Sequence, residues 1–148
     1  MRSSSQEALG GRSRKRRAAC LAVEMLAMAA TPSLLRVRIA DGTVLCDRCE
    51  VPKNSFGRMR GLLGRSGLEP GGGMLIEAAP SVHMFFMRFP IDVVFLDRDR
   101  KVVGVRHELR PWRVAGARHA VAALELPAGA AASVAEGDVL VLEDLDVA

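Results

Sequence analysis

An apolar run near the middle of the chain, residues 91–96 (IDVVFL), limits more than any other feature what this sequence can fold into. Successive side chains of a strand point to opposite faces, and both faces of this run are apolar except at Asp92. We therefore predict a strand that is covered on both sides. The polar residues 97–100 form a turn, and residues 101–108 return as the second strand of a hairpin.

Short segments of the same kind recur along the chain. Further strands are expected at residues 35–39, 43–46, 74–77, 121–126 and 139–143. Residues 81–89 are expected to be extended and to stop at Pro90. A short helix is expected over residues 56–63, and residues 128–135 are expected to form one or two helical turns. The fold class is therefore mainly β: a small compact β-barrel-like domain with one or two short helices.

Composition supports one domain with a core, since 49% of the 148 residues are hydrophobic. The net charge of +4 is unevenly spread. Residues 1–20 hold six Lys and Arg against one Glu, whereas the remainder holds 15 basic and 16 acidic residues. A body this close to neutral gives no general reason to expect nucleic acid binding.

Residues 1–33 precede the predicted β domain. We predict a leader over residues 1–33 and a single β-barrel-like domain over residues 34–148. Residues 1–17 are rich in Ser, Gly and Arg without an apolar period, so we expect them to be disordered. The Ala-rich residues 18–30 leave two interpretations open. One is a disordered or misassigned leader of a cytoplasmic protein, and the other is a weak signal or anchor that exports the protein or attaches it to a membrane. No later run has the length of a membrane span.

Asp92 is the leading candidate for a functional residue. A carboxylate that enters a buried strand is unfavourable unless it is paired or accepts backbone N–H groups. It either pins the corner after Pro90 or binds a ligand, and Arg88 is its expected basic partner. We predict a groove at the Met87–Asp92 corner whose ligand-binding residues are His83, Phe86, Met87, Arg88, Asp92 and Trp112. Trp112 stands on the rim of this groove or, alternatively, caps one end of the barrel.

Two kinds of catalysis, acid–base catalysis and a serine triad, are alternatives to a binding groove. Asp92 and His83 could act as acid and base on a small polar substrate. A Ser81-based triad lacks the sharp nucleophile turn and the oxyanion donors that its mechanism needs.

Cys46 and Cys49 form a lone C-x-x-C, which is a weak metal candidate because a structural zinc site needs four ligands. The two thiols are otherwise a pair near a strand end that can form a disulfide.

Several motifs follow one another in order along the chain: Arg58-x-Arg60-Gly61-Leu62-Leu63, Gly73-Met74-Leu75, Phe86-Met87-Arg88 with Pro90-Ile91-Asp92, Leu124-Glu125-Leu126-Pro127-Ala128-Gly129, and Gly137-Asp138. Together they resemble the family called domain of unknown function 192. The resemblance covers roughly residues 35–143. It implies a small, mainly β domain of bacteria and archaea without an established activity. Phe86 departs from the commoner pattern of the family, which has tryptophan there.

The leading hypothesis is a non-enzymatic accessory protein that binds a small ligand or a protein at the Met87–Asp92 corner. No cofactor is expected. The alternatives are an enzyme that uses Asp92 and His83 as acid and base, and a metal or thiol-redox protein that uses Cys46 and Cys49.

Overall fold

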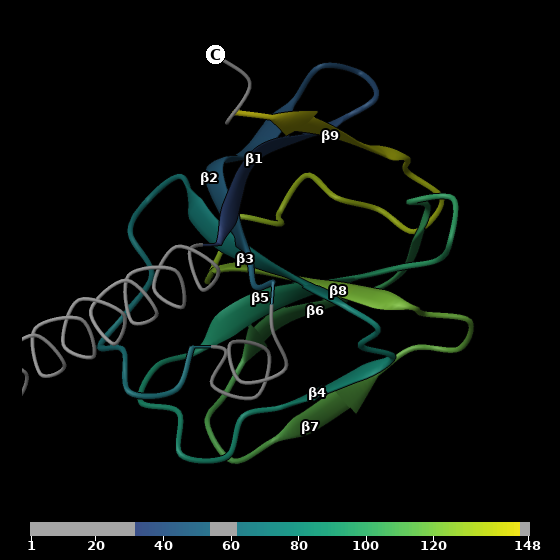
Figure 1. Cartoon of the computed structure of the whole chain (residues 1–148). Coiled ribbons are helices and arrows are strands. Elements are labelled where there is room, and N and C mark those ends of the chain that lie inside the picture. Colours follow the sequence, from purple (N-terminus) through teal and green to yellow (C-terminus); the bar gives the residue numbers. More distant parts are fainter. Residues whose placement is uncertain (1–31, 54–61, 146–148) are drawn as a thin grey trace, which may run out of the picture. The chain divides into compact units, whose positions relative to one another are not determined.

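A computed structural model describes residues 32–53 and 62–145 of the chain. The strands of this part, in chain order, are β1 (Ser33–Ile39), β2 (Val44–Val51), β3 (Gly72–Glu77), β4 (Ser81–His83), β5 (Ile91–Leu96), β6 (Val102–Leu109), β7 (Val114–Gly116), β8 (Ala122–Pro127) and β9 (Leu140–Asp144). Seven of them form one sheet in the order β6-β5-β8-β3-β2-β1-β9, and β4 pairs with β7 in a second, two-stranded sheet (Figure 1).

The large sheet is antiparallel except for the parallel pair of β2 and β3. It curls until the beginnings of its two edge strands meet. Lys101 and Val139 form an isolated bridge there, and Val102 N–H donates to the Asp138 carbonyl at 2.8 Å. Because the edges meet at one end only, the sheet forms a half-barrel.

Two apolar cores lie on the two faces of the curled sheet. One cluster lies inside the curl and includes Val37, Leu75, Val94 and Leu124. The other lies on the opposite face, beneath β4 and β7, and includes Val93, Met84, Met87 and Ala115. The alternation along β5 explains the division, since Val93 and Val94 point to opposite faces and enter different cores.

The predicted central hairpin is confirmed. β5 is buried at all six positions, as expected for a strand that is covered on both sides. It pairs antiparallel with β6 after the turn at residues 97–100, where the Asp97 carboxylate accepts the N–H groups of Asp99 and Lys101. The main statement of a mainly β fold is likewise confirmed.

The predicted helical turns at residues 128–135 are wrong. This segment consists of consecutive turns, with Ala130 N–H donating to the Pro127 carbonyl and Val134 N–H to the Ala131 carbonyl. Gly129 takes a positive φ of 89°, and the N–H of Ala131 bonds to a side chain instead of continuing a helix. The helix expected over residues 56–63 lies outside the described residues except for its last two positions, and no helix is present in the part of the chain that the structure covers.

The expected extended segment over residues 81–89 is wrong beyond its first three residues. β4 ends at His83, and Met87 N–H closes a turn onto the Met84 carbonyl at 3.2 Å. Phe86 inside this turn has a positive φ of 62°, which an extended strand does not allow. As a result Met87 turns into the second core while Phe85 and Phe86 face solvent.

Candidate functional site

Asp92 is fully buried on β5, and both of its carboxylate oxygens accept backbone hydrogen bonds. Glu108 N–H donates to Oδ1 at 2.8 Å, and Ala131 N–H donates to Oδ2 at 2.9 Å. His107 lies at the edge of this arrangement, with Nδ1 3.6 Å from Oδ2 and its side chain half exposed. The buried acid is therefore satisfied by the main chain, as a buried charge requires.

An irregularity in β6 brings one of these donors to Asp92. Ile91 and Val93 pair with Leu109 and Arg106, so two steps on β5 oppose three on β6. Glu108 lies in this bulge and has a positive φ of 48°. By alternation with its neighbours Asp92 points into the curl, where the turns of residues 128–135 also contribute to the core. The carboxylate thus fastens a strand bulge and a distant loop to β5.

Exposed aromatic rings gather on the other side of the sheet, around β4 and β7. We call His83, Phe85, Phe86 and Trp112 the aromatic surface. Phe86 and Trp112 have ring centroids 4.9 Å apart, and Phe85 lies 6.1 Å from Trp112 and 5.0 Å from the ring of His83. Phe86 remains 73% exposed and Trp112 60% exposed. The surface holds three of the six Phe and Trp residues in the chain.

The main chain holds Phe86 and Trp112 in an unfavourable conformation. Both have a positive φ, 62° and 64°, which bulky residues rarely adopt. The Met84 carbonyl accepts Trp112 N–H at 2.8 Å, and Met84 N–H donates to the Arg113 carbonyl at 2.7 Å. These bonds tie the two loops together, so the ring pair rests on a fixed backbone.

The structure brings only some of the six predicted ligand-binding residues together. Phe86 and Trp112 are in contact, and His83 joins them through Phe85. Met87 is buried in the second core, and Arg88 is exposed.

Asp92 is set apart from these residues because its carboxylate points to the opposite face of β5. Within the described residues it forms no ion pair with Arg88, its expected partner, and the titratable side chain that contacts it there is His107. The predicted groove is therefore divided between the two faces of the sheet, and a ligand-binding role for each residue stays a prediction.

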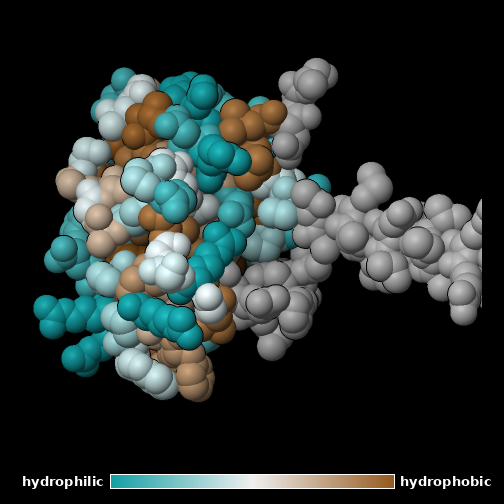
Figure 2. All heavy atoms as spheres, turned by 90° about the vertical axis from the view of Figure 1, so that its left-hand side faces the viewer, coloured by the Kyte–Doolittle hydropathy of each residue, from teal (hydrophilic) through white to brown (hydrophobic). Residues whose placement is uncertain are grey.

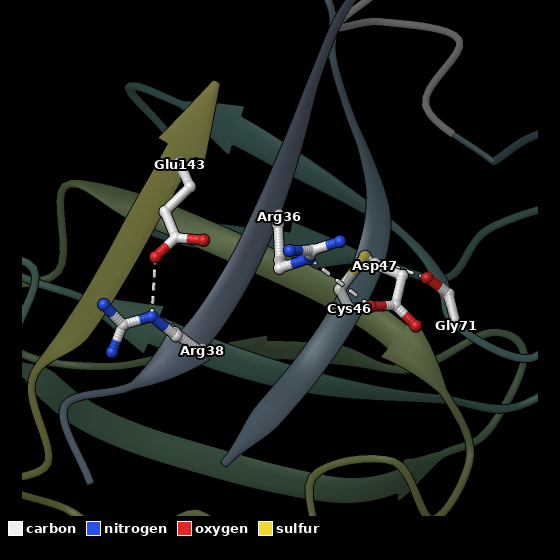
Figure 3. Close-up of polar contacts among 6 residues, drawn as sticks. All are labelled: Arg36, Arg38, Cys46, Asp47, Gly71 and Glu143. Atoms are coloured by element: carbon white, nitrogen blue, oxygen red, sulfur yellow. Dashed lines mark hydrogen bonds and ion pairs between the residues drawn. The ribbon is translucent and has the colours of Figure 1, made fainter. Parts of the chain in front are cut away.

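Cys46 and Cys49 are free, fully buried and lie on β2. A bulge opposite Leu35 and Val37 adds one residue between them, so both cysteines enter the core inside the curl. Cys46 donates its thiol to the Gly71 carbonyl at 3.3 Å (Figure 3). A hydrogen bond with Cys49 lowers the pKa of Cys46, whereas the bond with Cys46 and burial raise the pKa of Cys49. The part of the chain described contains no group of three or more His, Cys, Asp and Glu that could hold a metal.

Figure 3 also shows the ion pairs that join β1 to its neighbours. Arg38 bonds to Glu143 on β9 at 2.7 Å, and Arg36 lies 3.6 Å from Asp47 on β2. Their side chains are between 31% and 62% exposed, so solvent screens both pairs and each stabilises the fold by less than about 1 kcal/mol.

Glu125 is a second buried carboxylate to which the sequence analysis assigned no role. It lies on β8 between Met74 on β3 and Val93 on β5, and it is 7% exposed. Its Oε2 atom is fully buried and has no hydrogen-bond partner within residues 32–53 and 62–145. Burial raises the pKa of this carboxyl to about 7, and the positive charge of Arg65 opposes that shift.

A small cavity lies beside Arg65, the residue whose charge acts on the Glu125 carboxyl. It has a volume of about 300 Å³ and lies between the end of β2, the start of β3 and the loop of residues 65–70. Arg65 lines it and forms a bidentate pair with Glu50, with distances of 2.8 and 3.2 Å. Gly73 also lines it, and a Cβ there would lie 3.0 Å from the Glu125 carbonyl oxygen. Glu125 itself is not among the residues that line this cavity.

Sequence alone gave a weak signal for Glu125. Leu124, Glu125 and Leu126 alternate as in an ordinary strand with one wet face. Only Ala123, on the same face as Glu125, indicates that this face is also covered.

Two crystal structures of other proteins resemble this fold. One is of a proposed transcription regulator from Sinorhizobium meliloti, with a TM-score of 0.66 and 26% identity over 76% of this chain and 95% of that one. The other is of a protein of unknown function from Novosphingobium aromaticivorans, with a TM-score of 0.62 and 25% identity over 73% of this chain and 83% of that one.

Comparison of the sequence with known proteins finds a relative and a matching family. A protein named UPF0127 from Thermococcus sibiricus is 39% identical over 80 residues, which are 49% of this chain and 49% of that relative. The aligned region thus spans about half of that relative's length. The model of the family DUF192, described as "Uncharacterized ACR", matches residues 36–142, well over half of the chain. The chain belongs to the DUF192 family.

Proposed function

We propose that this protein is a binding module that recognises a protein partner through the aromatic surface. The observation that carries the proposal is the exposed Phe86–Trp112 ring pair, which the main chain holds at positive φ. Bulky residues in this conformation destabilise a fold by roughly 1–3 kcal/mol each, and such strain clusters at functional sites. Neither ring gains much burial in return.

Exposed aromatic rings on a fixed backbone suit a protein partner. Trp residues dominate the binding energy of many interfaces, because a large rigid ring fills a pocket at little entropic cost. Met87 and Phe89 support the surface from below, as both pack in the second core. Figure 2 shows a face of the molecule on which hydrophobic patches are interleaved with hydrophilic side chains, so exposure of an apolar group alone decides nothing.

The charge next to the rings indicates the character of the partner. Residues 84–90 and 110–113, which carry Phe85, Phe86 and Trp112, include three exposed arginines and no acidic residue. Arg88, Arg110 and Arg113 favour a segment in which acidic residues stand beside an apolar anchor. We therefore infer a protein segment of that composition as the partner.

Other partners are less well supported. The Sinorhizobium neighbour is described as a proposed transcription regulator, but residues 21–148 of this chain hold 15 basic and 16 acidic residues. That balance gives DNA no general attraction. No helix within residues 32–53 and 62–145 is long and apolar enough to cross a membrane.

Asp92 has a supporting part in this proposal. Its two backbone bonds fix the bulge before β6 reaches the loop of Trp112, so it acts on the shape of the surface and does not contact the partner. An acid–base role with His83 has less support, because the carboxylate faces the interior while His83 is exposed on β4.

The experiment is a selection of displayed random peptides on the purified protein, followed by titration of the enriched peptides. We expect acidic peptides with one large apolar residue. Binding should weaken at least about tenfold in Phe86→Asn and in Trp112→Asn, because loss of an aromatic anchor typically removes 2 kcal/mol or more. Asparagine tolerates a positive φ, so both variants should keep the fold.

The matched control is Val44→Asn, which removes a hydrophobic side chain that is 48% exposed outside the aromatic surface. Peptides that bind all three variants as well as the unmodified protein would refute the proposal. So would aromatic-dependent binding to phosphatidylserine vesicles or to a DNA duplex in place of peptides.

A further inference from the structure

The strand β4, which leads into the aromatic surface, has one edge that no other strand of the described residues covers. β4 and β7 form a two-stranded sheet, so each of them has a single neighbour in it. Met84 N–H donates to the Arg113 carbonyl at 2.7 Å, and Ala117 N–H donates to the Pro80 carbonyl at 3.4 Å. These two bonds, one at each end of the pair, set which residues of β4 face β7.

Ser81 and His83 turn their main-chain groups away from β7. Along an antiparallel pair, residues that bond to the neighbouring strand alternate with residues that bond to the other side. Pro80 and Met84 bond on the β7 side, and Val82 lies between them in the same alternation. Ser81 and His83 therefore present their N–H and C=O groups at the outer edge of β4, where none of these groups has a backbone partner within residues 32–53 and 62–145.

The outer edge of β4 is open to a binding partner. Ser81 and His83 are exposed, whereas Val82 and its cross-strand neighbour Ala115 are buried in the second core. An exposed sheet edge pairs readily with an extended backbone, because its donors and acceptors are unpaired. β4 has only three residues, so this edge alone is too short to hold another strand firmly. A partner strand needs a second anchor.

The aromatic surface supplies that anchor at the end of β4. His83 belongs to both features, and its ring lies 5.0 Å from the ring of Phe85, the second residue after the strand. A segment that pairs with β4 continues past Phe85 toward the other rings of the surface. The three exposed arginines beside those rings favour acidic residues in the same part of the segment.

We propose that the protein partner binds by strand addition: an extended segment pairs with Ser81 and His83 at the outer edge of β4 and places its apolar anchor on the aromatic surface. This inference rests on the proposed function and assigns the conformation of the partner segment. Main-chain hydrogen bonds hold the segment along β4, and the rings and arginines select its side chains.

The first test uses the tightest-binding peptide from the display selection, synthesised with a single N-methyl group at each position in turn. N-methylation removes one N–H donor, and only every second N–H of an added strand faces β4. Along the paired stretch, affinity should fall about threefold to tenfold at alternate positions. The positions between them are the matched control and should change affinity by less than about twofold, measured by calorimetry.

Amide hydrogen exchange of the protein reports on the same edge. When the peptide saturates the protein, the amides of Ser81 and His83 should exchange at least about tenfold more slowly, because each N–H gains an acceptor. Leu142 is the matched control at the outer edge of β9. Ala40 N–H bonds to the Val139 carbonyl, so by alternation Leu142 N–H faces away from β1. Its exchange should stay the same.

Ser81→Pro removes one edge donor from the protein. Proline is tolerated at the first residue of a strand and where the N–H faces solvent, so β4 and β7 should remain paired. The affinity for the peptide should fall about threefold or more. The N-methyl series uses the unmodified protein, so it decides the proposal independently of how this variant folds.

Two results would overturn strand addition and leave the aromatic surface as a binding site. One is binding that depends on Phe86 and Trp112 but shows no alternation along the N-methyl series. The other is unchanged exchange of the Ser81 and His83 amides in the complex. Binding that does not depend on Phe86 and Trp112, or a selection that enriches no peptide, would refute the proposed function and strand addition together.

Discussion

Asp92 and Glu125 are both buried acids on adjacent strands of one sheet, yet their surroundings differ completely. Asp92 pairs in register with Leu126, and Glu125 pairs with Val93, so the two lie within a few residues of each other across β5 and β8. Asp92 points into the curl and accepts two backbone N–H groups. Glu125 points to the other face and leaves Oε2 without a donor in the described residues.

This difference distinguishes an acid that the main chain satisfies from one that keeps an oxygen without a donor in the described residues. The donors of Asp92 belong to a strand bulge and a loop, so its charge fixes the shape of the main chain. The Oε2 atom of Glu125 holds no donor within residues 32–53 and 62–145, and the charge of Arg65 offsets only part of the desolvation penalty of this carboxyl. Burial alone is therefore a poor indicator of function, whereas burial without a partner is a good one.

The largest effect should come from Asp92→Ala. Removal of the carboxylate leaves the N–H groups of Glu108 and Ala131 buried without an acceptor, at roughly 1–3 kcal/mol each. The free energy of unfolding, measured by urea denaturation, should fall by about 3–5 kcal/mol.

Asp97→Ala is the matched control, because Asp97 also accepts two backbone N–H groups but in an exposed turn. Water replaces its bonds, so the loss should stay within about 1 kcal/mol. Equal losses in the two variants would contradict an architectural role for the burial of Asp92.

The next effect is the pH dependence that Glu125 adds to stability. In the folded protein its pKa is raised to about 7, against an ordinary value of 4.5 in the unfolded chain. The folded state therefore holds the proton more tightly, so this contribution is fully present below pH 4.5 and is lost as the pH rises through 7. The loss is on the order of 3 kcal/mol.

Glu125→Gln has no titrating group at this position. Its free energy of unfolding, from urea denaturation at matched pH values, should fall less steeply than that of the unmodified protein between weakly acidic and weakly basic pH. Parallel stability curves for the two proteins would show that Glu125 is already satisfied.

Glu50→Gln should lower the pKa of Glu125, which is the direction opposite to the effect of burial, and by a smaller amount. The bidentate partner of Arg65 loses its charge, so the guanidinium acts more strongly on the buried carboxyl. The pKa of Glu125 should fall by about one unit, which corresponds to about 1.4 kcal/mol. A carboxyl-detected NMR titration of both proteins measures this shift, and an unchanged or raised midpoint would exclude Arg65 as the charge that faces Glu125.

Much of the fold follows from short-range patterns in the sequence. The apolar faces of residues 91–96 and the turn at Asp97 predict β5, the turn and β6 from local alternation alone. The burial of Asp92 is predicted in the same way. Its donors are not, because Ala131 lies 39 residues away and Glu108 reaches it through a bulge that no local pattern encodes.

The candidate sites depend on what covers each strand. Glu125 sits in an ordinary alternating pattern, and only the packing of the second core against that face of β8 buries it. Phe86 is similar: the sequence predicts an extended segment there, but the positive φ in its turn directs the ring to solvent. Both depend on long-range contacts and turn geometry, which hydrophobic periodicity does not contain.

The smallest effect on stability should come from Phe86→Asn. The variant loses a ring contact worth about 0.5–1.5 kcal/mol but relieves backbone strain of similar size. The free energy of unfolding should therefore change by less than about 1 kcal/mol, although peptide binding is lost. Phe95→Ala, at a fully buried position, should destabilise by about 3–5 kcal/mol. A loss as large in Phe86→Asn would make Phe86 a packing residue.

The most direct test of the contrast between the two acids is a carboxyl-carbon NMR titration of Glu125 in the unmodified protein. The titration should show a midpoint near 7, because burial raises the pKa of this carboxyl. A midpoint at or below the ordinary 4.5 in the free protein would mean that the fold already supplies a partner, and the contrast with Asp92 would fail.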